Sequence, residues 1–291
     1  MATSRAKKIN NAGYWFILPA LILFTFFLII PMFNAFRLSL FKWDLLGAKI
    51  WVGIKNFRNL LQDEDFINSW GRTLYYTFLS AAILIVFSFI FALLLDSRKL
   101  KARNLFQAIY FIPVVLVTPA IAVVWKLMFQ TTGILNAVVS LLFNTSIPWL
   151  DSDRIALYSI IMVQVWVSVG YYMVMFIAGL QNIPDELHES AMIDGASWFR
   201  RLFAITIPLL QPTIILVLVT CIIFVFGQFP IPYVISQGGP NYSTELLTLF
   251  IYKNAFKFLK VGYSSAVTVF YFLTMLLFSI IQIRIFQDRE A

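Results

Sequence analysis

Long apolar runs alternate with short polar and charged intervals along the whole chain. Six runs are about as long as a helix must be to cross a hydrocarbon core of roughly 30 Å. They cover residues 14–36, 74–95, 105–124, 156–180, 205–229 and 263–283. Backbone polar groups in lipid must be satisfied within the segment, so each run predicts a helix. The pattern predicts an all-α polytopic membrane protein with six transmembrane helices.

Two of the apolar stretches carry further information. Pro113 and Pro119 fall inside the third run, where they should bend the helix. The run 134–143 is too short to cross and predicts a helix on the outer surface. Gly238, Gly239 and Pro240 predict a turn before the last run.

Basic residues set the expected orientation. Arg98, Lys99, Lys101 and Arg103 crowd the loop 96–104, and basic loops of this length are typical of the cytoplasmic side. This orientation puts both termini in the cytoplasm, where Arg5, Lys7 and Lys8 precede the first run and Asp288 and Arg289 follow the last. Basic residues are equally numerous on the two sides of the membrane in this topology. The orientation is therefore inferred from the density of basic residues near the span ends, and the reversed topology remains the alternative.

The interval between the fourth and fifth runs is polar and predicts two short helices. Pro184 suits a first helical turn, and Asp185 and Glu186 follow at the positive end of the helix dipole. Gly195 comes where a chain leaving a helix often needs positive φ, and Ser197 can cap the next helix.

The first of these helices is too short to be stable in water by itself. Leu187, Ala191 and Met192 form one stripe at helical spacing, with small neighbours that permit close approach. Such a helix could fit a groove on another protein. His188, the only histidine, has no metal-ligand spacing or serine partner, and we expect it to be solvated or to face that protein.

The same interval resembles a known family. Glu189-Ser190-Ala191, Asp194-Gly195-Ala196, Ile205 and Pro208-Leu209 are similar to the cytoplasmic "EAA" loop of membrane subunits of ATP-binding-cassette importers, which usually have Ala at the position of Ser190. The segments 52–66 and 236–252 resemble sugar-importer subunits of the maltose and glycerol-phosphate type. The resemblance implies one permease domain, 1–291, with a coupling loop at 182–204. The residues that it places against the ATPase are Asp185, Glu186, Glu189, Ser190, Ala191, Asp194, Gly195 and Ala196.

The resemblance also implies an assembly in a bacterial or archaeal cell membrane, the inner one where there are two. Its other parts are a second homologous permease chain, a dimeric ATPase that holds ATP and Mg²⁺, and an external solute-binding protein. The chain itself is expected to hold no cofactor.

Composition and charge agree with a membrane protein. Of the 291 residues, 60% are hydrophobic, more than one soluble core could use. The net charge of +8 is scattered among apolar runs, which favours anionic lipids over nucleic acid as partners. The single cysteine, Cys221, permits neither a disulfide nor a metal cluster and suits a small buried side chain.

Chemistry for driving transport is missing from the sequence. The six runs contain no charged residue, whereas ion-coupled carriers commonly keep ionisable groups at mid-membrane. The phosphate-binding pattern G-x-x-x-x-G-K-[ST] does not occur either. One histidine and one cysteine, far apart, argue against a membrane-embedded enzyme. These observations favour a transport subunit whose ATP hydrolysis takes place on a separate chain.

Uncharged polar and aromatic residues within the runs are candidates for the substrate path, because rings pack on sugar C–H faces and amides or hydroxyls meet the OH groups. The foremost are Gln164, Tyr171, Thr220, Gln228 and Tyr271. Ser168, Tyr172, Thr268 and Thr274 are further candidates. Hydroxyls in membrane helices also bond to their own backbone, so a structural role is the alternative for each. The expected cargo is a sugar or oligosaccharide, with glycerol phosphate or another small organic solute as the alternative.

Overall fold

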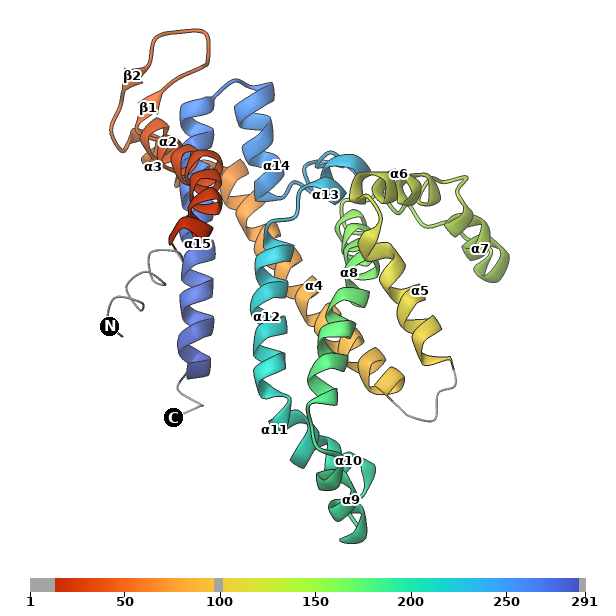
Figure 1. The fold of residues 1–291 in the computed structure, drawn as a ribbon. Coiled ribbons are helices and arrows are strands. Elements are labelled where there is room, and N and C mark those ends of the chain that lie inside the picture. The colour runs from red at the N-terminus through yellow and green to blue at the C-terminus, as the bar shows by residue number, and fades with distance from the viewer. Residues whose placement is uncertain (1–13, 97–101, 288–291) are drawn as a thin grey trace, which may run out of the picture. The chain divides into compact units, whose positions relative to one another are not determined.

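A computed structural model describes residues 14–96 and 102–287, with side chains up to residue 284 (Figure 1). Within these residues, five helices are long and apolar enough to cross a membrane, and a bent pair of helices could supply one more. The all-α class is therefore confirmed. Of the charged residues on which the expected orientation depends, only Arg103 is described, at the start of α5. The others lie outside the described residues; they are Arg5, Lys7, Lys8, Arg98, Lys99, Lys101, Asp288 and Arg289.

The described residues form two compact units: those up to residue 64 together with 251–273, and those between 65 and 250 together with those from 274 onward. The first unit begins with the helix Tyr14–Leu38, which contains a π-helical stretch, η1 (Thr25–Ile29), followed by α2 (Ile30–Leu38). Pro31 lies in the first turn of α2 and has no N–H to donate, so the regular hydrogen-bond ladder is interrupted there. None of the apolar window of this helix is buried inside the chain.

The remainder of the first unit contains a small hairpin that the sequence did not predict. Strand β1 (Phe41–Lys42) pairs antiparallel with β2 (Ile50–Trp51), and α3 (Lys55–Leu60) follows. Strands of two residues have too little alternation to be recognised from a sequence.

Side chains fix this hairpin to its surroundings. The buried Asn56 amide donates to the carbonyl oxygens of Ser39 and Phe41 at 2.8 and 2.9 Å. The Tyr263 hydroxyl, near the start of α15 (Val261–Gln287), donates to the Asp63 carboxylate at 2.5 Å.

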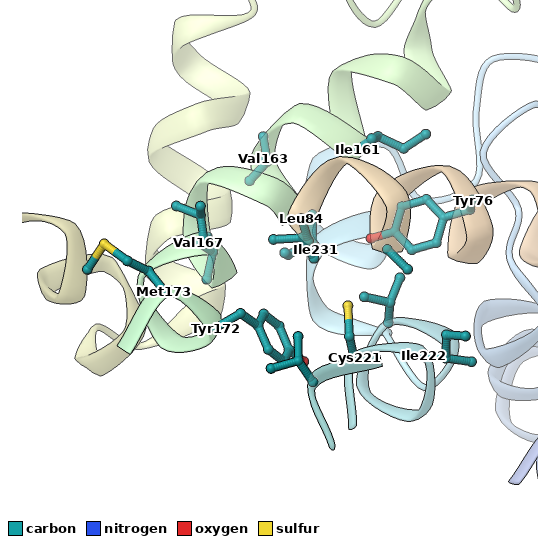
Figure 2. Packing of buried hydrophobic residues seen from close by; sticks show 14 of the residues in the cluster. Tyr76, Leu84, Ile161, Val163, Val167, Tyr172, Met173, Cys221, Ile222 and Ile231 are labelled. Atoms are coloured by element: carbon teal, nitrogen blue, oxygen red, sulfur yellow. The ribbon is translucent and has the colours of Figure 1, made fainter. Parts of the chain in front are cut away.

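In the second unit the core is built from α4 (Glu64–Asp96), α8 (Ala156–Gln181) and α12 (Gln211–Phe226). Helix α8 is central, because 67% of its apolar window is buried, more than in any other candidate span of the described residues. Figure 2 shows Tyr76, Tyr172 and Cys221 within this packing. Cys221 is fully buried, as expected for a small apolar side chain.

The α4 helix begins at Glu64, ten residues before the predicted run, because polar residues can continue a helix that the apolar pattern no longer marks. Helix α8 agrees with its predicted bounds to within one residue.

Helices α5 (Arg103–Val115) and α6 (Thr118–Met128) replace the predicted third span. They meet at 97°, a much sharper bend than one kinked helix would show. Leu116 and Val117 are extended, and Pro119 lies in the first turn of α6, where a proline fits. The short helix α7 (Ile134–Phe143) has the predicted bounds.

The chain of the fifth run is also interrupted. It begins as η2 (Leu202–Thr206) and α11 (Ile207–Leu209), continues as α12, and stops at Gly227. Two short helices follow, α13 (Pro230–Ile235) and α14 (Leu247–Tyr252), with π-helical η3 (Lys253–Lys257) after them. The predicted turn at Gly238 is confirmed, with a φ of +92°.

Candidate functional site

The interval between α8 and α12 folds as the two short helices that the sequence predicts. Helix α9 (Asp185–Ile193) carries Asp185 and Glu186 in its first turn. Pro184 is extended and lies just before the helix, so its expected place inside the first turn is wrong by one residue. Helix α10 (Trp198–Arg201) is capped by the Ser197 hydroxyl, which accepts from the Arg200 N–H at 3.4 Å.

Gly195 ends α9 with the predicted positive φ, +77°. The Ala196 N–H donates to the Ala191 carbonyl at 2.8 Å, and the Gly195 N–H donates to the Met192 carbonyl at 3.1 Å. These two bonds form a Schellman cap, which needs a residue in the left-handed region. No atom lies within 4 Å of a Cβ built on Gly195, so the backbone angle alone requires glycine here.

Helix α9 has no buried residue, and its apolar side chains are open. Leu187, Met192 and Ile193 are 41%, 50% and 87% exposed. Glu186, Glu189, Ser190 and Asp194 are exposed as well. Figure 1 shows α9 and α10 beyond the ends of α8 and α12. Within the described residues, therefore, no part of the chain buries Leu187, Met192 or Ile193, and Ala191 is half-buried.

His188 is half-buried and lines a cavity of about 190 Å³. Asp96 at the end of α4, Asp185 and Arg201 line the same cavity. The Asp96 carboxylate forms an ion pair with Arg103 at 3.3 Å.

A second cavity, of about 470 Å³, lies among α5, α6, α8 and α12 and brings several predicted path residues together. Its lining residues are Val114, Thr118, Val167, Ser168, Tyr171, Tyr172, Thr220 and Phe224. The lining contains hydroxyl groups and aromatic rings but no charged side chain, so it offers hydrogen bonds and ring faces without an ionic partner. We call it the α8 cavity.

Tyr171 and Thr220 differ in what they present to the α8 cavity. Tyr171 is 45% exposed. The Thr220 hydroxyl donates within its own helix, to the Leu216 carbonyl at 2.7 Å or the Val217 carbonyl at 3.2 Å. Its proton is therefore used, as is common for threonine in membrane helices.

Gln164 and Gln228 lie behind the cavity wall. Their side chains are 0% and 6% exposed, and the Gln228 Nε2 donates to the Gln164 Oε1 at 2.5 Å. Gln164 in turn donates to the Ser168 hydroxyl, which does line the cavity. The two glutamines thus reach the cavity through a serine.

Other expected path residues lie elsewhere. Tyr271 belongs to the first unit, is half-buried on α15 and does not line the α8 cavity. Thr268 donates to the Ser264 carbonyl at 2.9 Å, and Thr274 is buried. Thr118 was not predicted. It reaches the cavity because α5 and α6 part at the sharp bend, and the two nearby prolines were the available signal.

Within the described residues, no group of three or more His, Cys, Asp or Glu side chains is arranged to hold a metal ion.

Comparison with known proteins places the chain in a family. Residues 97–290 match the model of the binding-protein-dependent transport system inner membrane component. The trehalose/maltose transport system permease protein MalF of Thermococcus litoralis is 33% identical over 99% of this chain and 98% of its own length. The sn-glycerol-3-phosphate transport system permease protein UgpA of Pectobacterium atrosepticum is 31% identical over 96% and 94%.

The fold is also that of a solved transporter. A bacterial ABC transporter that imports the acidic polysaccharide alginate matches over 99% of both chains, with a TM-score of 0.86 and 22% identity. The structure of a bacterial alginate ABC transporter in complex with an alginate pentasaccharide-bound periplasmic protein matches over 96% of this chain and 94% of that chain, with a TM-score of 0.83 and 22% identity.

This chain belongs to the family of inner-membrane components of binding-protein-dependent transport systems. The family membership agrees with the similarity seen at Glu189, Gly195 and Pro208 and identifies a transport component rather than an enzyme.

Proposed function

We propose that this chain is one membrane subunit of an ATP-driven importer and forms half of the path for a neutral sugar or oligosaccharide. The observation that carries the proposal is α9, a helix of nine residues that ends in a Schellman cap and has no buried residue. A helix of this length is marginal in water, so it needs a partner surface over Leu187 and Met192.

The partner is an ATPase dimer that holds ATP and Mg²⁺, because the chain has no phosphate-binding loop of its own. When the ATPase subunits close on ATP they move α9, which is joined to α8 by residues 182–184 and to α12 through α10, η2 and α11. ATP then favours one of two arrangements of the helices through differential contacts with them. Glu189, exposed on α9, meets a cationic group of the ATPase.

A second, homologous permease chain supplies the other half of the path, and a solute-binding protein delivers the cargo from outside. The complex of the alginate transporter with its periplasmic protein supports this assembly. The six-span topology with both ends inside, and a place in a bacterial or archaeal cell membrane, complete the proposal.

The α8 cavity supports a neutral cargo. Ser168, Thr118 and Tyr171 offer hydroxyl groups, and the rings of Tyr171 and Phe224 can pack on sugar C–H faces. The name of the relative UgpA favours a phosphorylated cargo instead. An anion would need a positive group in the path, and the lining of the α8 cavity supplies none.

The orientation of α9 can be tested by labelling. Ile193→Cys places a thiol at a position that is 87% exposed, whereas the native Cys221 is buried and serves as the unreactive background. We expect a membrane-impermeant maleimide to label Ile193→Cys in inverted vesicles and not in intact cells, and an added ATPase partner to protect it. Labelling from outside the cell would contradict the proposal.

A further inference from the structure

A chain of hydrogen bonds begins at the wall of the α8 cavity and runs into the core. The Ser168 Oγ, on the wall, accepts from the Gln164 Nε2 at 2.9 Å. Gln164 is 0% exposed, so it cannot touch a cargo in the cavity. Any influence of Gln164 on the cargo must pass through Ser168.

Gln164 connects three parts of the second unit. Its Oε1 accepts from the Gln228 Nε2 at 2.5 Å and from the Tyr76 hydroxyl at 3.2 Å. An amide oxygen has two lone pairs, so both are in use. The three residues come from α8, α4 and the break between α12 and α13.

Gln228 holds that break in place. Its backbone carbonyl accepts from the Thr248 hydroxyl at 2.7 Å, and its Oε1 accepts from the Phe229 N–H at 3.1 Å. Thr248 belongs to α14, whose first residue, Leu247, donates its N–H to the Thr73 hydroxyl of α4 at 2.7 Å. Helix α13, just after the break, packs on α6 and α8. A shift of Gln228 would therefore be felt by α13 and α14 together.

The Ser168 hydroxyl still has a proton to give. Among the described residues it accepts from Gln164 and donates to no acceptor. A sugar oxygen in the α8 cavity can take this proton. A hydroxyl that donates becomes a better acceptor, and an amide whose N–H is bonded more strongly has a more negative oxygen. Binding at Ser168 thus strengthens the bonds from Gln164 to Gln228 and Tyr76.

We propose that Gln164 is a positioning residue that transmits occupancy of the α8 cavity to the break between α12 and α13. This inference rests on the proposed function, because it takes the cargo to be a hydroxyl-rich sugar in that cavity. A sugar in the cavity stabilises the arrangement in which the Gln228 side chain is bonded to Gln164 of α8. When the cavity is empty, that arrangement is less favoured. Gln164 and Gln228 then act through Ser168, without contact to the sugar.

The test uses the complete transporter in nanodiscs, with its ATPase partner and binding protein. The measured quantity is the ratio of ATPase rates with sugar-loaded and with empty binding protein. Gln164→Met keeps the length of the side chain and removes the amide. We expect the ratio to fall at least about threefold. A ligand shifts the equilibrium between two states only by its differential interaction with them, and the variant removes that interaction. Ser168→Ala and Gln228→Met should give the same fall, and Gln164→Met with Ser168→Ala should be no worse than either alone.

Ser88→Ala is the matched control. Ser88 is buried on α4 and donates to the Val169 carbonyl of α8 at 3.1 Å. It therefore also links two helices, but it takes no part in the hydrogen bonds that join Ser168, Gln164 and Gln228. We expect it to keep the wild-type ratio even if it lowers the melting temperature.

The inference is overturned if Gln164→Met keeps the same ratio as Ser88→Ala, or if Ser168→Ala lowers the ratio while Gln164→Met and Gln228→Met do not. If Gln164→Met does not reach the membrane, Ser168→Ala and Gln228→Met decide the outcome in the same way. A wild-type complex with no response to loaded binding protein would instead refute the proposed function.

Discussion

Replacing Gly195 with alanine is expected to lower ATP-dependent uptake about tenfold while leaving membrane insertion intact. Gly195 has a φ of +77°, and the left-handed region costs an L-residue with a Cβ roughly 1–2 kcal/mol. About 1.4 kcal/mol corresponds to a tenfold change in an equilibrium constant. The strain favours a loop in which the Schellman cap opens and α9 leaves the position that fits its partner. Gly195→Val should have a larger effect, because branched side chains tolerate this region least.

Two matched variants separate backbone angle from bulk. Gly195→Asn should retain most of the uptake, because asparagine visits the left-handed region readily and a side chain at this position meets no atom within 4 Å. Gly71→Ala should be neutral, since Gly71 lies in α4 and its Cβ would also be unobstructed. Uptake and sugar-stimulated ATPase rates are measured together. Equal activity of Gly195→Val and wild type would show that the loop does not couple the two.

Tyr171→Ala is expected to lower the maximal uptake rate by up to about tenfold, if an aromatic ring against a sugar face contributes as much as one in an aromatic pair, roughly 0.5–1.5 kcal/mol. Tyr171 is the aromatic residue of the α8 cavity wall with a hydroxyl and 45% exposure. Tyr171→Phe keeps the ring and should lose only a part of the rate. The rate is measured with saturating, loaded binding protein.

Thr220→Val provides a control at another lining residue of the α8 cavity. The Thr220 hydroxyl already donates to the Leu216 carbonyl, so the substitution removes a bond within α12 and little that a sugar could use. We expect uptake within about twofold of wild type. A loss in Thr220→Val with normal uptake by Tyr171→Ala would contradict the assignment of the cavity.

The sequence predicted the helices where the apolar pattern is long and uninterrupted. Helix α8 and the short helix α7 match their runs because both ends are marked by polar residues or by an αL residue, Asn144. The ends of α9 were also predictable, since Gly195 and Ser197 have strong local preferences for caps.

Features set by packing were not predictable from one sequence. Pro113 and Pro119 indicated a bend, but its size of 97° depends on how α6 packs on α13 and α8. The hairpin of β1 and β2 depends on hydrogen bonds from Asn56, 15 and 17 residues from their acceptors.

The candidate path residues were likewise predictable only in part. Tyr171, Ser168 and Thr220 share one cavity, so choosing polar and aromatic residues by type identified part of a wall. Composition could not show that Gln164 and Gln228, 64 residues apart, bond to each other, because this depends on how α8 meets the break after α12. It also could not show that Tyr271 lies in the other compact unit.

The most direct test is transport by proteoliposomes that contain this chain, its companion permease, the ATPase and the binding protein. We expect a neutral oligosaccharide to accumulate only when ATP, the ATPase and the loaded binding protein are all present. Accumulation by this chain without an ATPase, or driven by an ion gradient alone, would contradict the proposed function.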